Sequence, residues 1–451
     1  MGFKNIEQKS FGYSLLFVVA KFWHDIAFYR KVVVLNRHNI PKDANVIFTP
    51  NHQNALMDAL ALLFTNPRRL IFMARADIFA KPAVASILYF LKILPIYRSR
   101  DGKGSMQKNE IIFERTVDVL TTGNGLVLLP EGSHAGVHKI RPLKKGFARI
   151  AFQTEESNNF SLDIKILPIG IDYSNYQDFR TTLLVNFGPA ISVSNYYDQF
   201  KENPALAINT LKSDLELRMK ELIVNIESET YYELYVLLKD IYNDRMRDTM
   251  GLTKKNHTNK FKADRELIRL LARFEKENPG KMPAIDELVK SFTVKREGFG
   301  FANEQLANGQ ASIVSLLSKS VLLFILLPVF VYGLLNNALT FGITVWAGSK
   351  IKDPQFKSSF KYAVSLLAFP IFYILQTVIV ALVFEPTWFY WVYLLSLPLS
   401  AAFSWWWNSA FIHLRNQWKF FSLSKKANPV FVTMMGEYRL IIEKISSVVS
   451  K

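Results

Sequence analysis

The sequence predicts an α/β domain followed by a charged helical extension and a membrane-embedded helical region. Short β-rich runs alternate with helical stretches between residues 31 and 195. Residues 203–277 are highly charged and carry Leu and Ile at three-to-four spacing, which is typical of surface helices. After residue 312 the chain has uncharged runs that are long enough to cross a bilayer.

These changes of composition predict five segments in chain order. They are an N-terminal interfacial helix (1–30), an α/β domain (31–195), a charged helical extension (196–312), a transmembrane helical region (313–415) and a basic tail (416–451).

The overall composition limits the function classes. The formal charge of +17 favours an acidic partner, which can be nucleic acid, an anionic membrane surface or a phosphorylated substrate. The chain has no cysteine, so disulfides, thiolate zinc sites and a thiol nucleophile are excluded. The lysines are dispersed and the last third is apolar, so we expect no nucleic acid among the partners.

The N-terminal stretch 11–29 mixes aromatic and aliphatic residues with Lys21, His24 and Asp25. Its apolar run is too short to span a bilayer, so we expect a helix that lies on the membrane surface. An ordinary docking helix is the alternative interpretation.

The α/β domain should contain six strands and four helices. The expected strands are Lys31–Leu35, Asn45–Thr49, Leu70–Met73, Gly125–Leu129, Lys165–Ile171 and Thr182–Phe187. The expected helices fall near 57–65, 81–91, 107–122 and 145–153.

The C-terminal region has three uncharged or nearly uncharged runs, at 320–349, 362–384 and 386–414. Lysine and arginine clusters lie between the first two runs and after the third. The positive-inside rule places both clusters in the cytoplasm, so runs two and three should form a hairpin that turns at Glu385 and Pro386. The first run should then be re-entrant or a hairpin, with Asn336–Asn337 as the candidate turn, which keeps the N-terminal portion on the same side.

The segment 49–58 (TPNHQNALMD) is the main candidate for chemistry. His52 lies between a strand-like run and a helical run, with Asp58 just downstream, as in a general base and its orienting group. Positions six apart face away from each other on one helix. The two side chains can therefore meet only if His52 is in the loop and Asp58 is in the first helical turn. Such a pair is more often structural than catalytic, so other segments must support it.

Three further segments carry candidate groups. Residues 93–101 form a strand-like run ending in Arg98 and Arg100, whose guanidinium groups suit phosphate. Residues 126–134 run from a strand into a Pro-Glu-Gly turn, and residues 141–148 place Lys144 and Lys145 before a helix, a plausible anion site. Residues 166–171 form a buried strand with Pro and Gly, which suggests an edge strand or a close backbone approach.

Taken in order, these blocks (NH-x5-D, PIYR, LPEGS, RPLKKG and ILPIGI) resemble the membrane glycerolipid acyltransferases, the PlsC-like or AGPAT/GPAT family. The resemblance covers roughly residues 40–195. It implies an α/β sandwich with His52 as the base that deprotonates the acceptor hydroxyl and Asp58 as its orienting group. It also implies substrate-binding roles for the following residues: Arg98, Arg100, Glu131, Gly132, Ser133, Lys144, Lys145 and Pro168.

Two departures bear on the acceptor. The usual first block has four residues between His and Asp, whereas this chain has five, and the usual Glu-Gly-Thr-Arg is replaced by Glu-Gly-Ser-His, which places His134 where the family has arginine. Both departures resemble the fungal-type glycerol-3-phosphate/dihydroxyacetone-phosphate acyltransferase branch. They favour glycerol-3-phosphate as the acceptor, with 1-acylglycerol-3-phosphate or another lysophospholipid as the alternative.

The resemblance further implies the partners and the location. The acyl donor would be acyl-CoA or acyl carrier protein, and no metal or other cofactor is expected. Membrane lipid would be a partner, with the catalytic domain on the cytoplasmic face of a bacterial inner membrane or the endoplasmic reticulum. A non-enzymatic lipid-binding protein is the alternative from a different class.

Overall fold

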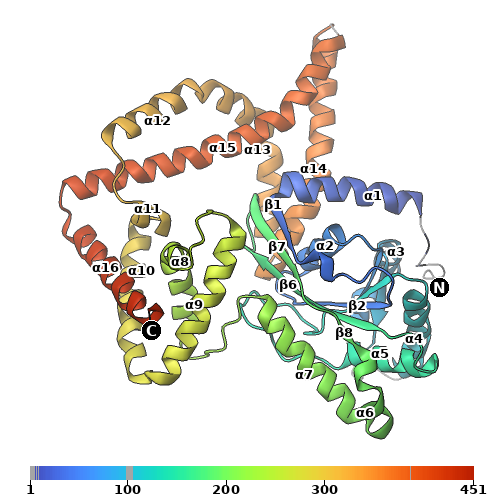
Figure 1. Cartoon of the computed structure of the whole chain (residues 1–451). Helices are drawn as coiled ribbons and strands as arrows, with labels where there is room; N and C mark the ends of the chain where they lie inside the picture. The colour runs from blue at the N-terminus through green and yellow to red at the C-terminus, as the bar shows by residue number, and fades with distance from the viewer. Residues whose placement is uncertain (1–5, 7, 9, 98–104, 386, 451) are drawn as a thin grey trace. The chain divides into compact units, whose positions relative to one another are not determined.

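The computed structural model describes residues 6, 8, 10–97, 105–385 and 387–450 (Figure 1). The chain divides into two compact units. The first comprises residues 1–225 and 351–362, and the second comprises residues 226–350 and 363–451. The first unit holds the α/β domain, and the second is helical in its described residues.

The first unit is built on a mixed β-sheet. Its strand order is β1 (Tyr29–Leu35), β7 (Thr181–Phe187), β6 (Lys165–Tyr173), β2 (Val46–Pro50), β5 (Gly125–Val127), β3 (Leu70–Arg75) and β4 (Ile93–Ile96), with β8 (Ile191–Ser192) paired to β6. Neighbouring strands run parallel except where β6 meets β7 and β8. The predicted α/β fold class is confirmed, and all six expected strands are present.

Helices cover this sheet and complete its core. They are α1 (Phe11–Phe22), a π-helix (Trp23–Phe28), α2 (Leu56–Thr65), α3 (Pro82–Phe90), α4 (Ser105–Thr121), α5 (Gly146–Ser157), α6 (Tyr197–Glu202) and α7 (Pro204–Leu222). The buried face of α7 has Leu211, Leu215 and Met219 in the same core cluster as Ile166 of β6. The core of this unit therefore extends past residue 195.

The close approach expected in the segment 166–171 occurs at Gly170, where a Cβ atom would lie 2.2 Å from the carbonyl oxygen of Leu222. The expectation of an edge strand is wrong, because β6 lies between β2 and β7. Pro168 is tolerated in this interior strand for a local reason. Its carbonyl accepts from the N–H of Gly188, which lies just after β7 ends. The proline nitrogen points to the same side of the strand, where β7 has already ended, so the missing N–H breaks no pairing with β7.

Helix α1 docks through one face, which includes Tyr13 edge to face with Phe90, and its other face is apolar and exposed. Lys21 donates to the carbonyl of Phe64 at 2.7 Å, and the Phe17 and Phe64 rings meet edge to face. Phe11, Val18 and Phe22 are exposed. The contacts support the docking interpretation for one face of the helix, and the interfacial placement of the other face stays a prediction.

The second unit consists of helices in its described residues. They are α8 (Tyr232–Thr249), α9 (His257–Glu277), α10 (Met282–Phe299), α11 (Asn303–Asn308), α12 (Ile313–Ile325), α13 (Leu327–Ser349), α14 (Pro354–Val383) from residue 363 onward, α15 (Thr387–Lys425) and α16 (Pro429–Val449). Among the described helices, α13 and α14 are long and apolar enough to cross a membrane.

The re-entrant turn expected at Asn336–Asn337 is wrong, because α13 continues through both residues. Each amide donates to the carbonyl four residues earlier, and Tyr393 and Tyr373 donate to the amide oxygens of Asn336 and Asn337. The first run is instead interrupted at Leu326, just before Pro328 opens α13. Helix α14 ends at Val383 and α15 begins at Thr387, on either side of the expected turn, and Pro386 itself lies outside the described residues.

Candidate active site

The segment between β2 and α2 brings His52 and Asp58 together. His52 lies in the loop and Asp58 is the third residue of α2, so the helix start turns the carboxylate back toward the loop. The Nδ1 atom of His52 lies 2.9 Å from Oδ2 of Asp58. Ala55 has φ +45°, a conformation that non-glycine residues rarely adopt, and this kink accommodates the five residues between His52 and Asp58.

Asp58 is fully buried and is surrounded by hydrogen-bond donors. Besides His52, its Oδ2 accepts from the backbone N–H of Gln53 at 2.8 Å and of Asn54 at 2.7 Å. Its Oδ1 accepts from the hydroxyl of Tyr173 at 2.7 Å. A buried carboxylate is stable only when it is paired and hydrogen-bonded, so this set of donors fixes the orientation of Asp58 and through it the imidazole.

Tyr173 was not among the residues predicted from the sequence. It is the last residue of β6, and burial together with the nearby Asp58 carboxylate raises its pKa well above the usual value. The phenol therefore stays protonated and keeps donating. Tyr173 is 115 residues from Asp58 in the chain, and nothing in the local pattern marks it.

Asn51 fixes the start of the loop to the sheet. Its side-chain oxygen accepts from the backbone N–H of Ile171 at 2.6 Å, and its side-chain nitrogen donates to the carbonyl of the same residue at 3.1 Å. The amide extends the pairing of β2 with β6 by one residue beyond Pro50. This holds His52 at the carboxyl end of β2.

Glu131 connects the Pro-Glu-Gly turn to the histidine loop. Its Oε1 accepts from the backbone N–H of His52 at 2.7 Å, and its Oε2 accepts from Nε of Arg141 at 2.9 Å. Burial raises the pKa of Glu131, while the His52 N–H and the Arg141 guanidinium oppose that rise. Arg141 also donates to the hydroxyl and the carbonyl of Ser133, so one guanidinium holds this turn in shape.

Arg141 begins the basic segment 141–148, and no role in the site was predicted for it from the sequence. A signal was available, because a buried glutamate needs a cationic or donor partner and Arg141 lies ten residues from Glu131.

Gly132 and Lys144 lie next to each other. Gly132 has φ +72°, and a Cβ atom there would lie 3.3 Å from Cγ of Lys144. The backbone N–H of Lys144 donates to the carbonyl of Pro130 at 2.7 Å, so the lysine stem crosses the turn. Lys145 precedes α5, and its side chain is exposed.

Pro168 and the two arginines are the remaining residues for which a substrate-binding role was predicted. Pro168 is paired in register with Thr49, three residues before His52, so it supports the strand that leads to the loop. Arg98 and Arg100 lie outside the described residues.

Comparisons with known proteins identify the domain that carries this loop. The acyltransferase family model matches residues 31–172. Residues 31–172 form a domain of the acyltransferase family. The PlsC-like glycerolipid acyltransferase resemblance seen in the sequence blocks is confirmed.

Two proteins are similar to this chain. A 1-acyl-sn-glycerol-3-phosphate acyltransferase of Borreliella burgdorferi is 27% identical over 181 residues, which is 38% of this chain and 66% of that relative. The crystal structure of the 1-acyl-sn-glycerophosphate acyltransferase PlsC from Thermotoga maritima aligns with a TM-score of 0.33 at 20% identity, over 46% of this chain and 77% of that chain. The chain thus spans slightly less than two thirds of the curated relative.

The geometry of the acyltransferase domain suits proton transfer at one atom. Asp58 engages Nδ1 of His52, and within the described part of the chain Nε2 of His52 has no hydrogen-bond partner. The His52 side chain is 16% exposed, so the ring is not closed off from solvent. An imidazole held through one nitrogen and open at the other is arranged as a general base.

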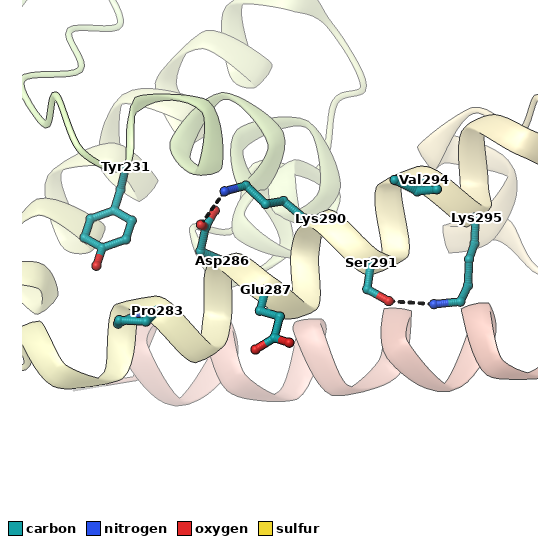
Figure 2. A pocket seen from close by; sticks show the side chains of 8 residues that line it. All are labelled: Tyr231, Pro283, Asp286, Glu287, Lys290, Ser291, Val294 and Lys295. Atoms are coloured by element: carbon teal, nitrogen blue, oxygen red, sulfur yellow. Dashed lines mark hydrogen bonds and ion pairs between the residues drawn. The ribbon is translucent and has the colours of Figure 1, made fainter.

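A groove of about 710 Å³ lies on α10 of the second unit (Figure 2). Its lining residues are Tyr231, Pro283, Asp286, Glu287, Lys290, Ser291, Val294 and Lys295. Lys290 is paired with Asp286, and Lys295 with Ser291 and Glu437. The groove contains none of the predicted site residues. Among the described residues of the chain, no three His, Cys, Asp or Glu side chains are placed to hold a metal ion.

Proposed function

We propose that the chain transfers a fatty acyl group from a thioester donor to a hydroxyl of a glycerophosphate acceptor in phospholipid synthesis. The observation that carries the proposal is the buried Asp58 that holds His52 through Nδ1 inside an acyltransferase-family domain. The acyl donor is acyl-CoA or acyl carrier protein, both of which present a thioester.

The chemical step follows from the open nitrogen of His52. Nε2 takes the proton from the acceptor hydroxyl while the hydroxyl oxygen attacks the carbonyl carbon of the thioester. The carbon–sulfur bond then breaks, and the thiolate leaves and takes up the proton from the imidazolium. Asp58 stabilises the positive charge that develops on the ring, and Tyr173 holds the far oxygen of Asp58 in place.

The acceptor phosphate is held by cationic side chains in this proposal. Lys144 is exposed and crosses the Glu131–Gly132–Ser133 turn, which hydrogen-bonds to the backbone of His52. Lys145 is exposed at the start of α5 and can add a second charge. Arg141 is committed to Glu131 and Ser133, so it shapes the turn and is not available for phosphate.

Glycerol-3-phosphate is the first candidate acceptor. The five-residue spacing and the Glu-Gly-Ser-His ending of the third block are the features that favour it. The second candidate is 1-acylglycerol-3-phosphate, because the curated relative that matches 181 residues is named a 1-acyl-sn-glycerol-3-phosphate acyltransferase.

The proposal also places the chain at a membrane. The product is an amphiphile, and α13 and α14 have the length and composition to cross a bilayer. Lys350 and Lys352 lie between these helices and Lys357 and Lys361 lie in the first turns of α14, and together they favour a cytoplasmic location for this end of the two helices.

The test supplies the purified full chain with one acyl-CoA and each acceptor in turn. Lysophosphatidic acid formed from glycerol-3-phosphate supports the first candidate, and phosphatidic acid formed from 1-acylglycerol-3-phosphate supports the second. Absence of acyl transfer to both acceptors, with acyl-CoA or acyl carrier protein as donor, would contradict the proposed function.

A further inference from the structure

Residues 351–362 belong to the first unit although they lie far beyond the family domain in the chain. The segment includes the first turns of α14, and it contacts three loops around the candidate site as well as α1. The side chains that make these contacts are spread along the segment from Asp353 to Tyr362.

Asp353 holds His134, the residue at the position where the family resemblance expects arginine. Oδ2 of Asp353 lies 3.0 Å from Nε2 of His134, and this hydrogen bond holds the pKa of Asp353 below its usual range. The His134 ring meets the Phe356 ring edge to face at 4.8 Å and the His52 ring at 5.4 Å. One side of the candidate base is thus bounded by an imidazole whose orientation is set by residues of the segment.

Ser358 holds the other side of the histidine loop. Its hydroxyl donates to the side-chain oxygen of Asn54 at 2.7 Å, and both residues are buried. The backbone N–H of Asn54 donates in turn to Asp58 at 2.7 Å. The segment therefore reaches the His52–Asp58 pair by two independent routes.

Two further hydrogen bonds fasten the C-terminal end of the segment. Lys361 donates to the carbonyl of Gln177 at 2.8 Å, and the hydroxyl of Tyr362 donates to the carbonyl of Ala20 at 2.7 Å. These contacts tie the segment to the loop after β6 and to α1. A segment fastened at several points can hold His134 and Asn54 in fixed positions.

We propose that residues 351–362 clamp the two loops of the acyltransferase site, and that Asp353 is a positioning residue that acts through His134. This inference rests on the proposed function. It adds to the reaction a residue that lies outside the family domain.

A purely structural role for Asp353 is the competing explanation. Its Oδ1 accepts from the backbone N–H of Gln355 at 3.0 Å at the start of α14, as a helix N-cap does. The two carboxylate oxygens of Asp353 thus have different partners, and substitutions can separate the contact with His134 from the helix cap. Asp353→Ser keeps a capping hydroxyl but is too short to reach His134. Asp353→Glu keeps a carboxylate with longer reach but is a poor cap.

The experiment measures kcat and KM for the acceptor that the wild-type chain acylates, using the full chain. The variants are Asp353→Ser, Asp353→Glu, His134→Ala and the double variant with Asp353→Ser and His134→Ala. Asp286→Ser is the control, because it removes an i,i+4 ion pair on α10 of the second unit. Thermal unfolding of each variant shows whether the fold is retained.

We expect Asp353→Ser to lower kcat/KM about tenfold and Asp353→Glu to retain more activity than the serine variant. In the His134→Ala background, Asp353→Ser should cause no further loss, because its effect passes through the imidazole. If kcat/KM falls equally in Asp353→Ser and Asp353→Glu, the double variant shows whether the effect of Asp353 passes through His134.

Three results would overturn the clamp: wild-type kcat/KM in Asp353→Ser, a larger loss in Asp353→Glu than in Asp353→Ser, or losses that multiply in the double variant. His52→Ala separates this failure from failure of the proposed function. If His52→Ala is inactive while Asp353→Ser is not impaired, only the clamp is wrong. If His52→Ala retains full activity, His52 is not the base, whereas the proposed function itself fails only if the wild-type chain transfers no acyl group to either acceptor.

Discussion

Two regions of the chain bury polar side chains in apolar surroundings, and they leave those side chains in different states. In the first unit, Asp58 gathers donors from the loop and from Tyr173, while Nε2 of His52 is left open within the described part of the chain. In the second unit, the buried Asn337 donates to the Gly333 carbonyl and to Ser400 and accepts from Tyr373.

This difference distinguishes a candidate active site from a hydrogen-bond network that only stabilises the fold. The network around Asn337 uses the donor and acceptor groups of its amide to join α13, α14 and α15, and Gly333 lets the Ser400 backbone approach to 2.5 Å from where a Cβ would be. The network around Asp58 ends in the His52 ring, which is partly exposed and whose Nε2 has no hydrogen-bond partner among the described residues. Breaking the network around Asp58 should affect activity, and breaking the network around Asn337 should affect stability.

The largest effect expected among the supporting residues is that of Asp58→Asn. The amide would present its NH₂ group to the donors that now surround the carboxylate, and the imidazole would lose its charged orienting partner. We expect kcat to fall about 10³-fold while the fold is retained. Asp77→Asn, which removes an exposed ion pair with Arg75, is the matched control and should leave kcat unchanged. A kcat within twofold of wild type in Asp58→Asn would show that the carboxylate has no part in the reaction.

Tyr173→Phe tests the far side of the same network. The substitution removes one hydrogen bond to Asp58 and leaves the contact with His52 intact, so kcat should fall about tenfold, or about 1.4 kcal/mol. Tyr196→Phe is the control, because the Tyr196 hydroxyl also donates to an aspartate, Asp214, at 2.7 Å. Equal activity of the two variants would remove Tyr173 from the site.

Asn337→Ala tests the network of the second unit. The Tyr373 hydroxyl would lose its acceptor, and we expect the free energy of unfolding to fall by about 1–2 kcal/mol with acyl transfer unchanged at a permissive temperature. Thermal unfolding in detergent measures this, with the more exposed Asn416→Ala as control. Loss of activity without loss of stability would mean that this network has a role in the reaction.

The smallest effect concerns Glu131 and pH. Because the folded chain raises the pKa of Glu131 above 4.5, the folded state binds more protons at this group than the unfolded state between pH 4.5 and the raised pKa. The contribution of Glu131 to the free energy of unfolding therefore falls as pH rises through that window and is restored as pH falls. Glu131→Gln should remove this slope in thermal unfolding. An unchanged slope would show that the carboxyl does not titrate there.

The fold could be predicted from the sequence where burial leaves a local signature. Strands such as Val46–Pro50 and Lys165–Tyr173 are buried along their length, so they appear as apolar runs bounded by polar turns. Strand β8 has two residues and leaves no such signature. The turn expected at Asn336–Asn337 failed because polar residues in an apolar run suggest a break, whereas Tyr373 and Tyr393 satisfy them inside the bundle.

The site could be predicted only in part, for a similar reason. The spacing of His52 and Asp58 dictated a loop histidine and a helical aspartate, and the structure has this arrangement. Tyr173 and Asp353 reach the site by long-range contacts that no local pattern encodes. The catalytic and binding roles of the predicted residues stay predictions.

The most direct test of the proposed base is the activity of His52→Ala with the acceptor that the wild-type chain acylates. We expect kcat to fall at least about 10³-fold, because the atom that accepts the proton is removed, while the thermal unfolding midpoint stays close to wild type. A folded His52→Ala variant with wild-type kcat would contradict the claim that this imidazole is the base.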